Sequence, residues 1–83
     1  MTQYILMCRS MTTAQKAVNT LLRAGIFAAM SKAPQSANPE GCTYGAKIGE
    51  RNLQAARSVL ADAGVPVGKI LELTRNGIRE VRP

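Results

Sequence analysis

Residues 12–26 read TTAQKAVNTLLRAGI, a segment in which apolar side chains recur every three or four positions before a glycine. The recurring apolar residues are Ala14, Ala17, Val18, Leu21 and Leu22. This spacing predicts a helix with one apolar face, which Gly25 ends as the residue after its last turn. Thr12 and Gln15, three residues apart, predict a capping box at the start of the helix.

The same pattern returns later in the chain, where Gln54 stands 39 residues after Gln15. Its apolar positions are Leu53, Ala56, Val59, Leu60 and Ala63. Asn52 is the predicted cap of this second helix, and Gly64 with Pro66 just beyond ends it. An internal repeat of this kind fits two βαβ halves related by a pseudo-twofold axis.

Three strands are predicted before the second helix. Tyr4–Cys8 is a short apolar run typical of a buried central strand, and Ile26–Met30 is the second strand. Residues 33–40 contain two prolines and small polar residues, so they predict a loop. Apolar and polar positions alternate over Cys42–Ile48, which predicts a third strand with one face on the core.

The end of the chain predicts a fourth strand and a hairpin. Lys69–Thr74 is the strand, Asn76-Gly77 is a type I′ turn signal, and Ile78–Val81 can fold back as a short partner. The order of elements predicts one α+β domain over residues 1–83, of the ferredoxin-like βαββαβ type. It has an antiparallel sheet with two helices on one face, and its first and third strands lie side by side at the sheet centre.

Composition excludes several classes of function. The chain has 83 residues, a net charge of +6 and 4% aromatic residues, which disfavours a base-stacking nucleic-acid surface. Lys and Arg are scattered without a basic block, so a nucleic-acid partner is not expected. No run is long enough for a signal peptide or membrane span, which predicts a cytoplasmic location and no membrane partner.

No catalytic set emerges from the sequence. There is no histidine, no paired carboxylates at telling positions and no phosphate-binding loop, so a self-sufficient enzyme, a metal and a cofactor are not expected.

Cys42 is the candidate working residue. The predicted topology places it near Cys8 and near the start of the first helix, where the helix dipole and Arg9 would stabilise a thiolate. The flanking Gly41 and Gly45 would let another molecule approach the backbone, although Gly45 inside a strand also fits a bulge. The alternative is that the Cys42 side chain packs in the core, together with the other residues on the same face of this strand.

Further residues are candidates for supporting this site. Ser10, Thr12 and Thr13 at the helix start would stabilise negative charge, and Lys32 flanks the same region. Tyr44 is interpreted as a core or sheet-surface ring, with a ligand-binding hydroxyl as the alternative. Cys8, inside an apolar strand, is interpreted as a packing residue, and a Cys8–Cys42 disulfide requires Cα atoms within ~7 Å.

Several short motifs resemble one family. They are residues 4–10, Ala14 with Ala17, Leu22-x-x-Gly25-Ile26, Lys32-x-Pro34, Gly41-Cys42 and Ala63-Gly64-Val65. Together they are similar to the small bacterial selenium/sulfur carrier-like proteins over about residues 4–72. In this chain Thr43 follows Cys42 where a glycine is frequent, and Cys8 stands where an aromatic residue is usual.

The resemblance implies a cytoplasmic carrier whose Cys42 holds sulfur or selenium as a persulfide or selenosulfide. It also implies a sulfur- or selenium-donor protein as a partner. Two alternatives stay open on the residues alone. One is a ligand-sensing or homo-oligomeric assembly module that uses an edge strand and the Asn76-Gly77 hairpin. The other is weak nucleic-acid binding through the scattered Lys and Arg side chains.

Overall fold

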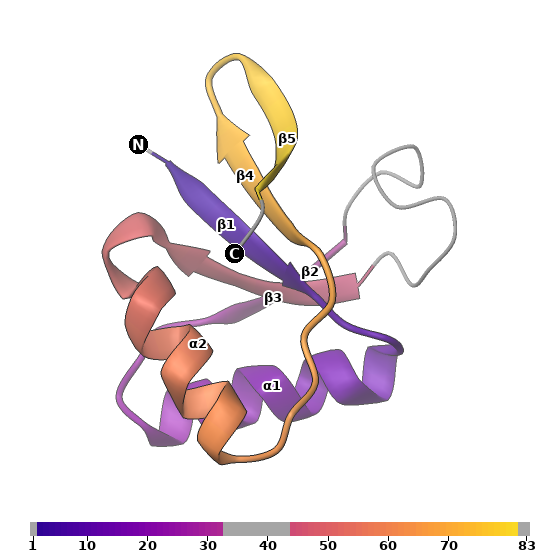
Figure 1. Ribbon diagram of the computed structural model, residues 1–83, viewed down its shortest axis with the longest axis vertical. Coiled ribbons are helices and arrows are strands. Elements are labelled where there is room, and N and C mark those ends of the chain that lie inside the picture. The colour runs from indigo at the N-terminus through magenta and orange to yellow at the C-terminus, as the bar shows by residue number, and fades with distance from the viewer. Residues whose placement is uncertain (1, 33–43, 82–83) are drawn as a thin grey trace.

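The computed structural model describes residues 2–32 and 44–81 and shows an α+β fold with a five-stranded antiparallel sheet and two helices (Figure 1). The elements are β1 (Gln3–Met7), α1 (Met11–Arg23), β2 (Ala29–Lys32), β3 (Tyr44–Gly49), the short 3-10 helix η2 (Glu50–Asn52), α2 (Leu53–Asp62), β4 (Ile70–Thr74) and β5 (Gly77–Val81). The strands lie in the order β2-β3-β1-β4-β5.

Strand β1 lies at the centre of this sheet. It runs antiparallel to β3, with Met7 opposite Gly45, and antiparallel to β4, with Leu6 opposite Ile70. The prediction that the first and third strands are antiparallel neighbours is therefore confirmed. The hairpin partner β5 pairs with the outer side of β4, so the sheet has five strands rather than the four of the βαββαβ plan.

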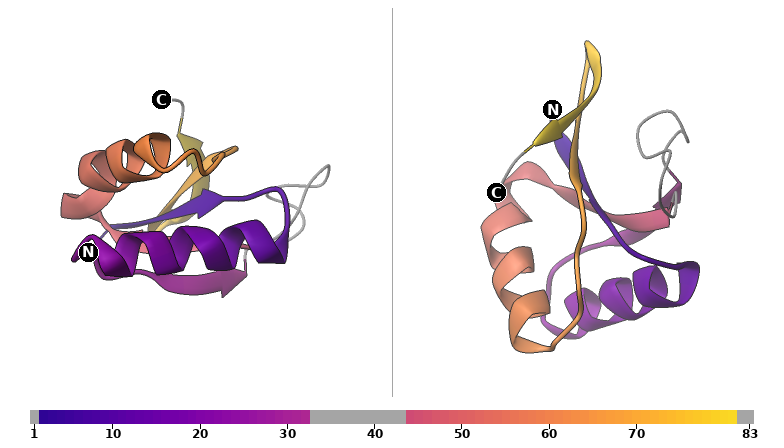
Figure 2. Two further views of the ribbon diagram at one scale, coloured as in Figure 1. Left: turned by 90° about the horizontal axis from the view of Figure 1, so that it is seen from below. Right: turned by 45° about the vertical axis from the view of Figure 1, so that its right-hand side comes forward.

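Both helices pack on one face of the sheet. Side chains from α1, α2 and alternate residues of β1 and β3 belong to a single buried cluster, here called the main core. Its largest fully buried members include Leu6, Leu21, Ile48 and Leu60. Figure 2 shows the two helices lying together, with the strands above them in its right-hand view. A smaller cluster of Ile5, Met7 and Leu71 is buried on the opposite face.

The internal repeat corresponds to two matching helix ends. Gly25 and Gly64 have φ values of +82° and +71°, a conformation that glycine adopts without steric cost. After α1, the N–H of Ile26 donates to the Leu21 carbonyl at 2.9 Å. After α2, the N–H of Val65 donates to the Leu60 carbonyl at 2.9 Å. Both glycines thus end their helices in the same Schellman arrangement, as the sequence predicted.

The predicted helix starts and the second strand need correction. Ser10, not Thr12, caps α1, so the capping box of Thr12 with Gln15 was wrong. Asn52 precedes α2 as predicted but makes no side-chain cap hydrogen bond, because η2 continues into the helix. The second strand is Ala29–Lys32 rather than residues 26–30, since Ile26 belongs to the Schellman turn.

The hairpin turn also differs from the prediction. Thr74 pairs with Gly77, so the two turn residues are Arg75 and Asn76. A type I′ turn requires positive φ at both of these residues, and neither has it. Gly77 instead carries the positive φ, at +125°, as the first residue of β5.

Candidate functional site

Two of the predicted site residues, Gly41 and Cys42, lie outside the described residues. Five others meet where β1 leaves the sheet: Cys8, Arg9, Ser10, Lys32 and Tyr44. We call this group the β1 exit. It comprises the end of β1, the start of α1, the last residue of β2 and the first residue of β3.

Backbone pairing holds the β1 exit together. The N–H of Cys8 donates to the Tyr44 carbonyl at 3.1 Å, one step beyond the last paired residues of β1 and β3. On the other side of β3, Lys32 lies directly opposite Tyr44. The end of β1 and the start of β3 are therefore adjacent, which is the juxtaposition that the sequence predicted.

The start of α1 brings donor groups to the β1 exit. Ser10 Oγ accepts a hydrogen bond from the Thr13 N–H at 3.1 Å and lies 3.1 Å from Thr13 Oγ1. The first turn of α1 contains no acidic residue, and Thr12 is exposed on it. The positive end of the helix dipole is consequently not offset by a local carboxylate in that turn.

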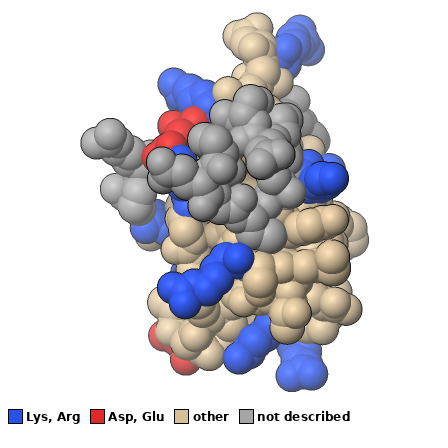
Figure 3. Space-filling model, turned by 90° about the vertical axis from the view of Figure 1, so that its right-hand side faces the viewer, with Lys and Arg blue, Asp and Glu red and all other residues tan. Residues whose placement is uncertain are grey.

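Two cationic residues belong to the β1 exit. Arg9 and Lys32 are both exposed there. Figure 3 looks onto the side of the molecule that carries the start of α1, and Lys and Arg side chains are spread over it. Acidic side chains are visible only near the left margin of that view. This side of the described surface therefore carries more positive than negative charge.

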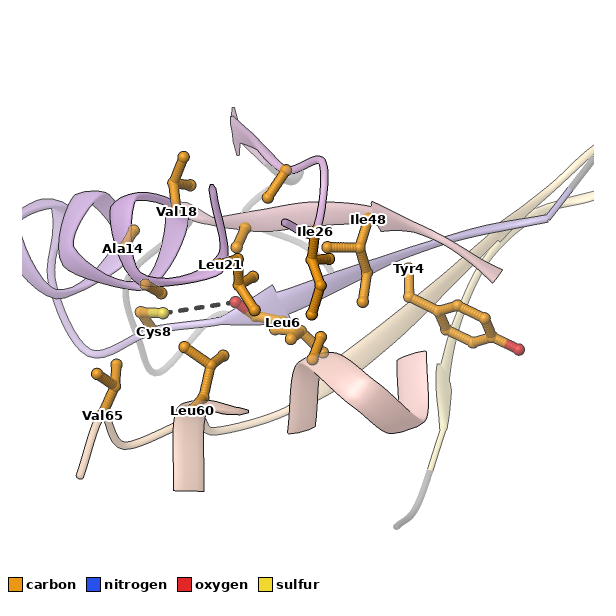
Figure 4. Close-up of a cluster of buried hydrophobic side chains, with 14 of the residues drawn as sticks. Tyr4, Leu6, Cys8, Ala14, Val18, Leu21, Ile26, Ile48, Leu60 and Val65 are labelled. Carbon is orange, nitrogen blue, oxygen red and sulfur yellow. Dashed lines mark hydrogen bonds between the residues drawn. The ribbon is translucent and has the colours of Figure 1, made fainter. Parts of the chain in front are cut away.

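Cys8 lies in the main core. Its side chain is 4% exposed, and Sγ donates to the Leu6 carbonyl at 3.5 Å. Figure 4 shows Cys8 between Ala14 of α1 and the Leu60–Val65 region that ends α2. These contacts agree with the interpretation of Cys8 as a packing residue.

Gly45 has a role that the sequence analysis did not identify. A Cβ atom at Gly45 would lie 2.6 Å from the Leu6 carbonyl oxygen and 2.7 Å from Ile5 Cγ2. Strand β1 itself thus fills the space that the missing side chain leaves. Gly45 pairs in continuous register with Met7 and Ser31, so it forms no bulge. Its function is close packing of β1 on β3 rather than access for another molecule.

Tyr44 is half-buried and packs against the main core. This placement matches its interpretation as a core ring. The predicted face of the third strand is likewise correct, because Ala46 and Ile48 belong to the same core while Lys47 lies opposite Ile5 on the other face.

The sequence analysis missed a polar network on the opposite half of the sheet. Tyr4 donates its hydroxyl to Glu72 Oε2 at 3.1 Å, and Arg79 donates Nε to Glu72 Oε1 at 3.0 Å. These three residues lie on β1, β4 and β5 in directly opposite positions. Only the strand register brings them together, so no local sequence pattern could have indicated the network.

This network predicts a pH dependence of stability. Burial, followed by the hydrogen bond to Glu72, raises the pKa of Tyr4 above its ordinary value in the folded chain. As the pH rises, the unfolded chain therefore loses this proton first. The stabilising contribution of Tyr4 is complete below about pH 10 and is lost as the pH rises through the folded pKa.

We expect urea unfolding between about pH 9 and 11 to show a steeper alkaline loss of stability in the wild type than in Tyr4→Phe. Tyr44→Phe is the matched control and should keep the steep limb. An identical alkaline slope in the wild type and Tyr4→Phe would contradict this assignment.

Comparison with known proteins gives one match. A family model described as "Putative Se/S carrier protein-like" matches residues 3–72. No curated protein and no solved structure matches the chain. Within the described residues, neither helix is long and apolar enough to cross a membrane.

Proposed function

The chain belongs to the Se/S carrier protein-like family, and from this premise we propose that it carries a sulfur or selenium atom on the thiol of Cys42. The observation that carries the proposal is the family match over residues 3–72, a range that includes Cys42 and the whole β1 exit. The exchange takes place with a donor protein that carries the atom as a persulfide or a selenosulfide.

The chain connectivity supports a role for the β1 exit. Cys42 is two residues before Tyr44, so two peptide units keep their Cα atoms within about 7 Å of each other. The Tyr44 carbonyl accepts a hydrogen bond from the Cys8 N–H, and Tyr44 lies opposite Lys32. Arg9 and the uncompensated start of α1 are at the same end of the sheet. Positive charge favours a thiolate over a thiol, so we expect the pKa of Cys42 to lie below the ~8.5 of a free cysteine.

The transfer step needs no external oxidant or reductant. The Cys42 thiolate attacks the terminal sulfur of a donor persulfide, R–S–SH, and forms the S–S bond of Cys42–S–SH. The bond between the two donor sulfurs breaks, and the donor leaves as the thiolate R–S⁻. A donor selenosulfide, R–S–SeH, gives Cys42–S–SeH in the same way. Delivery to an acceptor thiolate is the reverse exchange, with Cys42 leaving as the thiolate.

Loading of the protein with a small persulfide tests this proposal. The protein is reduced, desalted, treated with glutathione persulfide and measured as an intact mass. We expect the wild type and Cys8→Ala to gain the mass of one sulfur atom, which dithiothreitol removes, and Cys42→Ser to gain none. Equal gain in Cys42→Ser, or no gain in the folded wild type, would refute the assignment to Cys42.

The architecture supports a further part of the proposal. Four of the strands lie in the order β2-β3-β1-β4, and the family match ends at residue 72, inside β4. We therefore infer a ferredoxin-like carrier unit to which β5 is added at one edge. A cytoplasmic location is part of the same proposal, because persulfides require thiols that are kept reduced.

A further inference from the structure

Exposed apolar side chains gather at one edge of the molecule. Among the described residues the large exposed hydrophobics are Met11, Leu22, Phe27, Met30 and Ile78. The first four belong to α1, to β2 or to the segment that joins them, and β2 is the terminal strand of the sheet. Only Ile78 lies elsewhere, on β5 at the opposite edge.

The two residues of α1 lie on its flank toward β2. Figure 4 shows Val18 on the side of α1 that is turned away from Leu60 and Val65. Leu22 follows Val18 by four residues and Met11 precedes it by seven, so all three share one flank of the helix. Because α1 packs against α2 on one side and against β2 on the other, this flank faces the β2 edge.

Met30 completes the exposed surface on the helix side of the sheet. It lies opposite Ala46, whose side chain belongs to the main core, so Met30 points to the same face as α1. We call Met11, Leu22 and Met30 the edge patch; they are 51%, 48% and 38% exposed. Phe27, 77% exposed, lies in the segment that joins α1 to β2, between the core residues Ile26 and Ala28.

Charge identifies which kind of partner fits this edge. Two copies of a chain with a net charge of +6 repel each other, so a contact between them is favoured where the surface is locally neutral. On this flank of α1 the exposed residue one turn after Met11 is the uncharged Gln15. In an antiparallel pair of two β2 strands about a two-fold axis, Met30 or Ser31 faces its own copy at the centre. With Met30 at the centre, Lys32 faces residue 28 of the other copy and lies four positions along the strand from its equivalent.

The other edge does not offer this arrangement. Residues Gly77–Val81 form β5, with Arg79 and Glu80 at its middle. A two-fold antiparallel pair of β5 strands would place Arg79 against Arg79 or Glu80 against Glu80, and like charges directly opposite are destabilising. Charged residues on an edge strand are also a known means of preventing sheet-to-sheet association.

We propose that a second copy of this chain binds at the β2 edge, with β2 pairing antiparallel to β2 and α1 packing against α1 through the edge patch. Helix α1 packs on both β3 and β2, so it lies on the same face of the sheet as the edge patch and next to the β2 edge. The proposed contact brings the α1 helices of the two copies together at the separation of packed helices, about 8–10 Å. Both the sheet and the helix layer are then continuous across the dimer, through one self-complementary contact.

This interface is independent of the carrier chemistry. In the antiparallel arrangement the two β2 strands end in opposite directions, so the β1 exits lie at opposite ends of the contact. Each copy would keep its own cationic end accessible. The dimer is therefore expected with or without Cys42, and a chain that does not dimerise would leave the carrier proposal intact.

Sedimentation velocity under reducing conditions tests the interface over about 1 µM to 1 mM protein. We expect the wild type and Cys42→Ser to shift from one to two chains as the concentration rises. Leu22→Glu and Met30→Glu should each raise the dissociation constant about ten-fold or more, because each buries a charge at the contact. Ile78→Glu is the matched control at the opposite edge and should leave the dissociation constant within about two-fold.

Three results would overturn the proposal. They are a wild type that stays monomeric over the whole range, an Ile78→Glu variant that dissociates as strongly as Leu22→Glu, and a dimer that Cys42→Ser abolishes. Far-UV circular dichroism checks that each variant is folded. Leu22 and Met30 are both exposed and lie on different elements, so the two variants test the same contact independently.

Discussion

Replacing Gly45 by alanine is expected to lower the free energy of unfolding by about 1–3 kcal/mol or more, as overpacked cores do. The added Cβ atom would approach the Leu6 carbonyl oxygen to 2.6 Å and Ile5 Cγ2 to 2.7 Å. The first of these atoms is backbone in the central strand, so it cannot move without shifting β1 away from β3. Because β1 also pairs with β4, the strain would spread through the centre of the sheet.

Gly49 provides the matched control for this experiment. It ends the same strand, has a φ of −77° and ψ of 158°, and a Cβ atom there meets nothing within 4 Å. Gly49→Ala should therefore change the free energy of unfolding by about 0.5 kcal/mol or less, or stabilise slightly by restricting the unfolded chain. Urea denaturation of the two variants measures the difference. If Gly45→Ala is as stable as Gly49→Ala, the close approach of β1 and β3 at Gly45 is wrong.

The contrast between Gly45 and Gly25 shows which features a sequence can predict. Gly25 follows an amphipathic segment, so the local pattern alone indicated its role at the end of α1, and the matching Gly64 indicated the second helix end. Gly45 is required by an atom of a strand nearly forty positions away in the chain. Nothing in the residues around it reveals that neighbour, and its interpretation as an open approach to the backbone followed from local pattern only.

The misplaced features have the same physical origin. Ser10 and Thr12 are both good capping residues, and the cap is Ser10 because β1 leaves the sheet just before it. Asn76-Gly77 is a strong turn signal, but the register of β4 with β5 places Gly77 opposite Thr74 and moves the turn back by one residue. Local propensity identified the right kind of element in each case, while strand pairing decided its exact boundaries.

At the candidate site, antiparallel pairing of the first and third strands follows from the order of elements, so the adjacency of Cys8 and Tyr44 could be predicted from the sequence. The apolar residues next to Cys8 in the sequence favoured its burial but did not establish it. The network of Tyr4, Glu72 and Arg79 could not be predicted, since it depends on the register of three strands at once.

Cys8 and Cys42 are expected to differ in alkylation rate by about a thousand-fold or more in the native protein. Cys8 is 4% exposed within the main core, so its reaction with iodoacetamide requires an opening of the fold. An opening free energy of about 4 kcal/mol alone reduces the rate about a thousand-fold. Under the carrier proposal, Cys42 reacts directly and faster than an ordinary thiol at neutral pH. Peptide mass mapping of each cysteine over time measures both rates in one sample.

Gly45→Ala should show that the two cysteines react by different mechanisms. A loss of about 1–3 kcal/mol in stability would raise the Cys8 rate about 5- to 140-fold, at about 1.4 kcal/mol for each factor of ten. The Cys42 rate should change much less, because no opening limits it, and Gly49→Ala should alter neither rate. A Cys8 that reacts as fast as Cys42 in the native wild type would contradict its burial. A Cys42 whose rate rises in parallel with that of Cys8 would be a core residue too, and the carrier proposal would then lose its nucleophile.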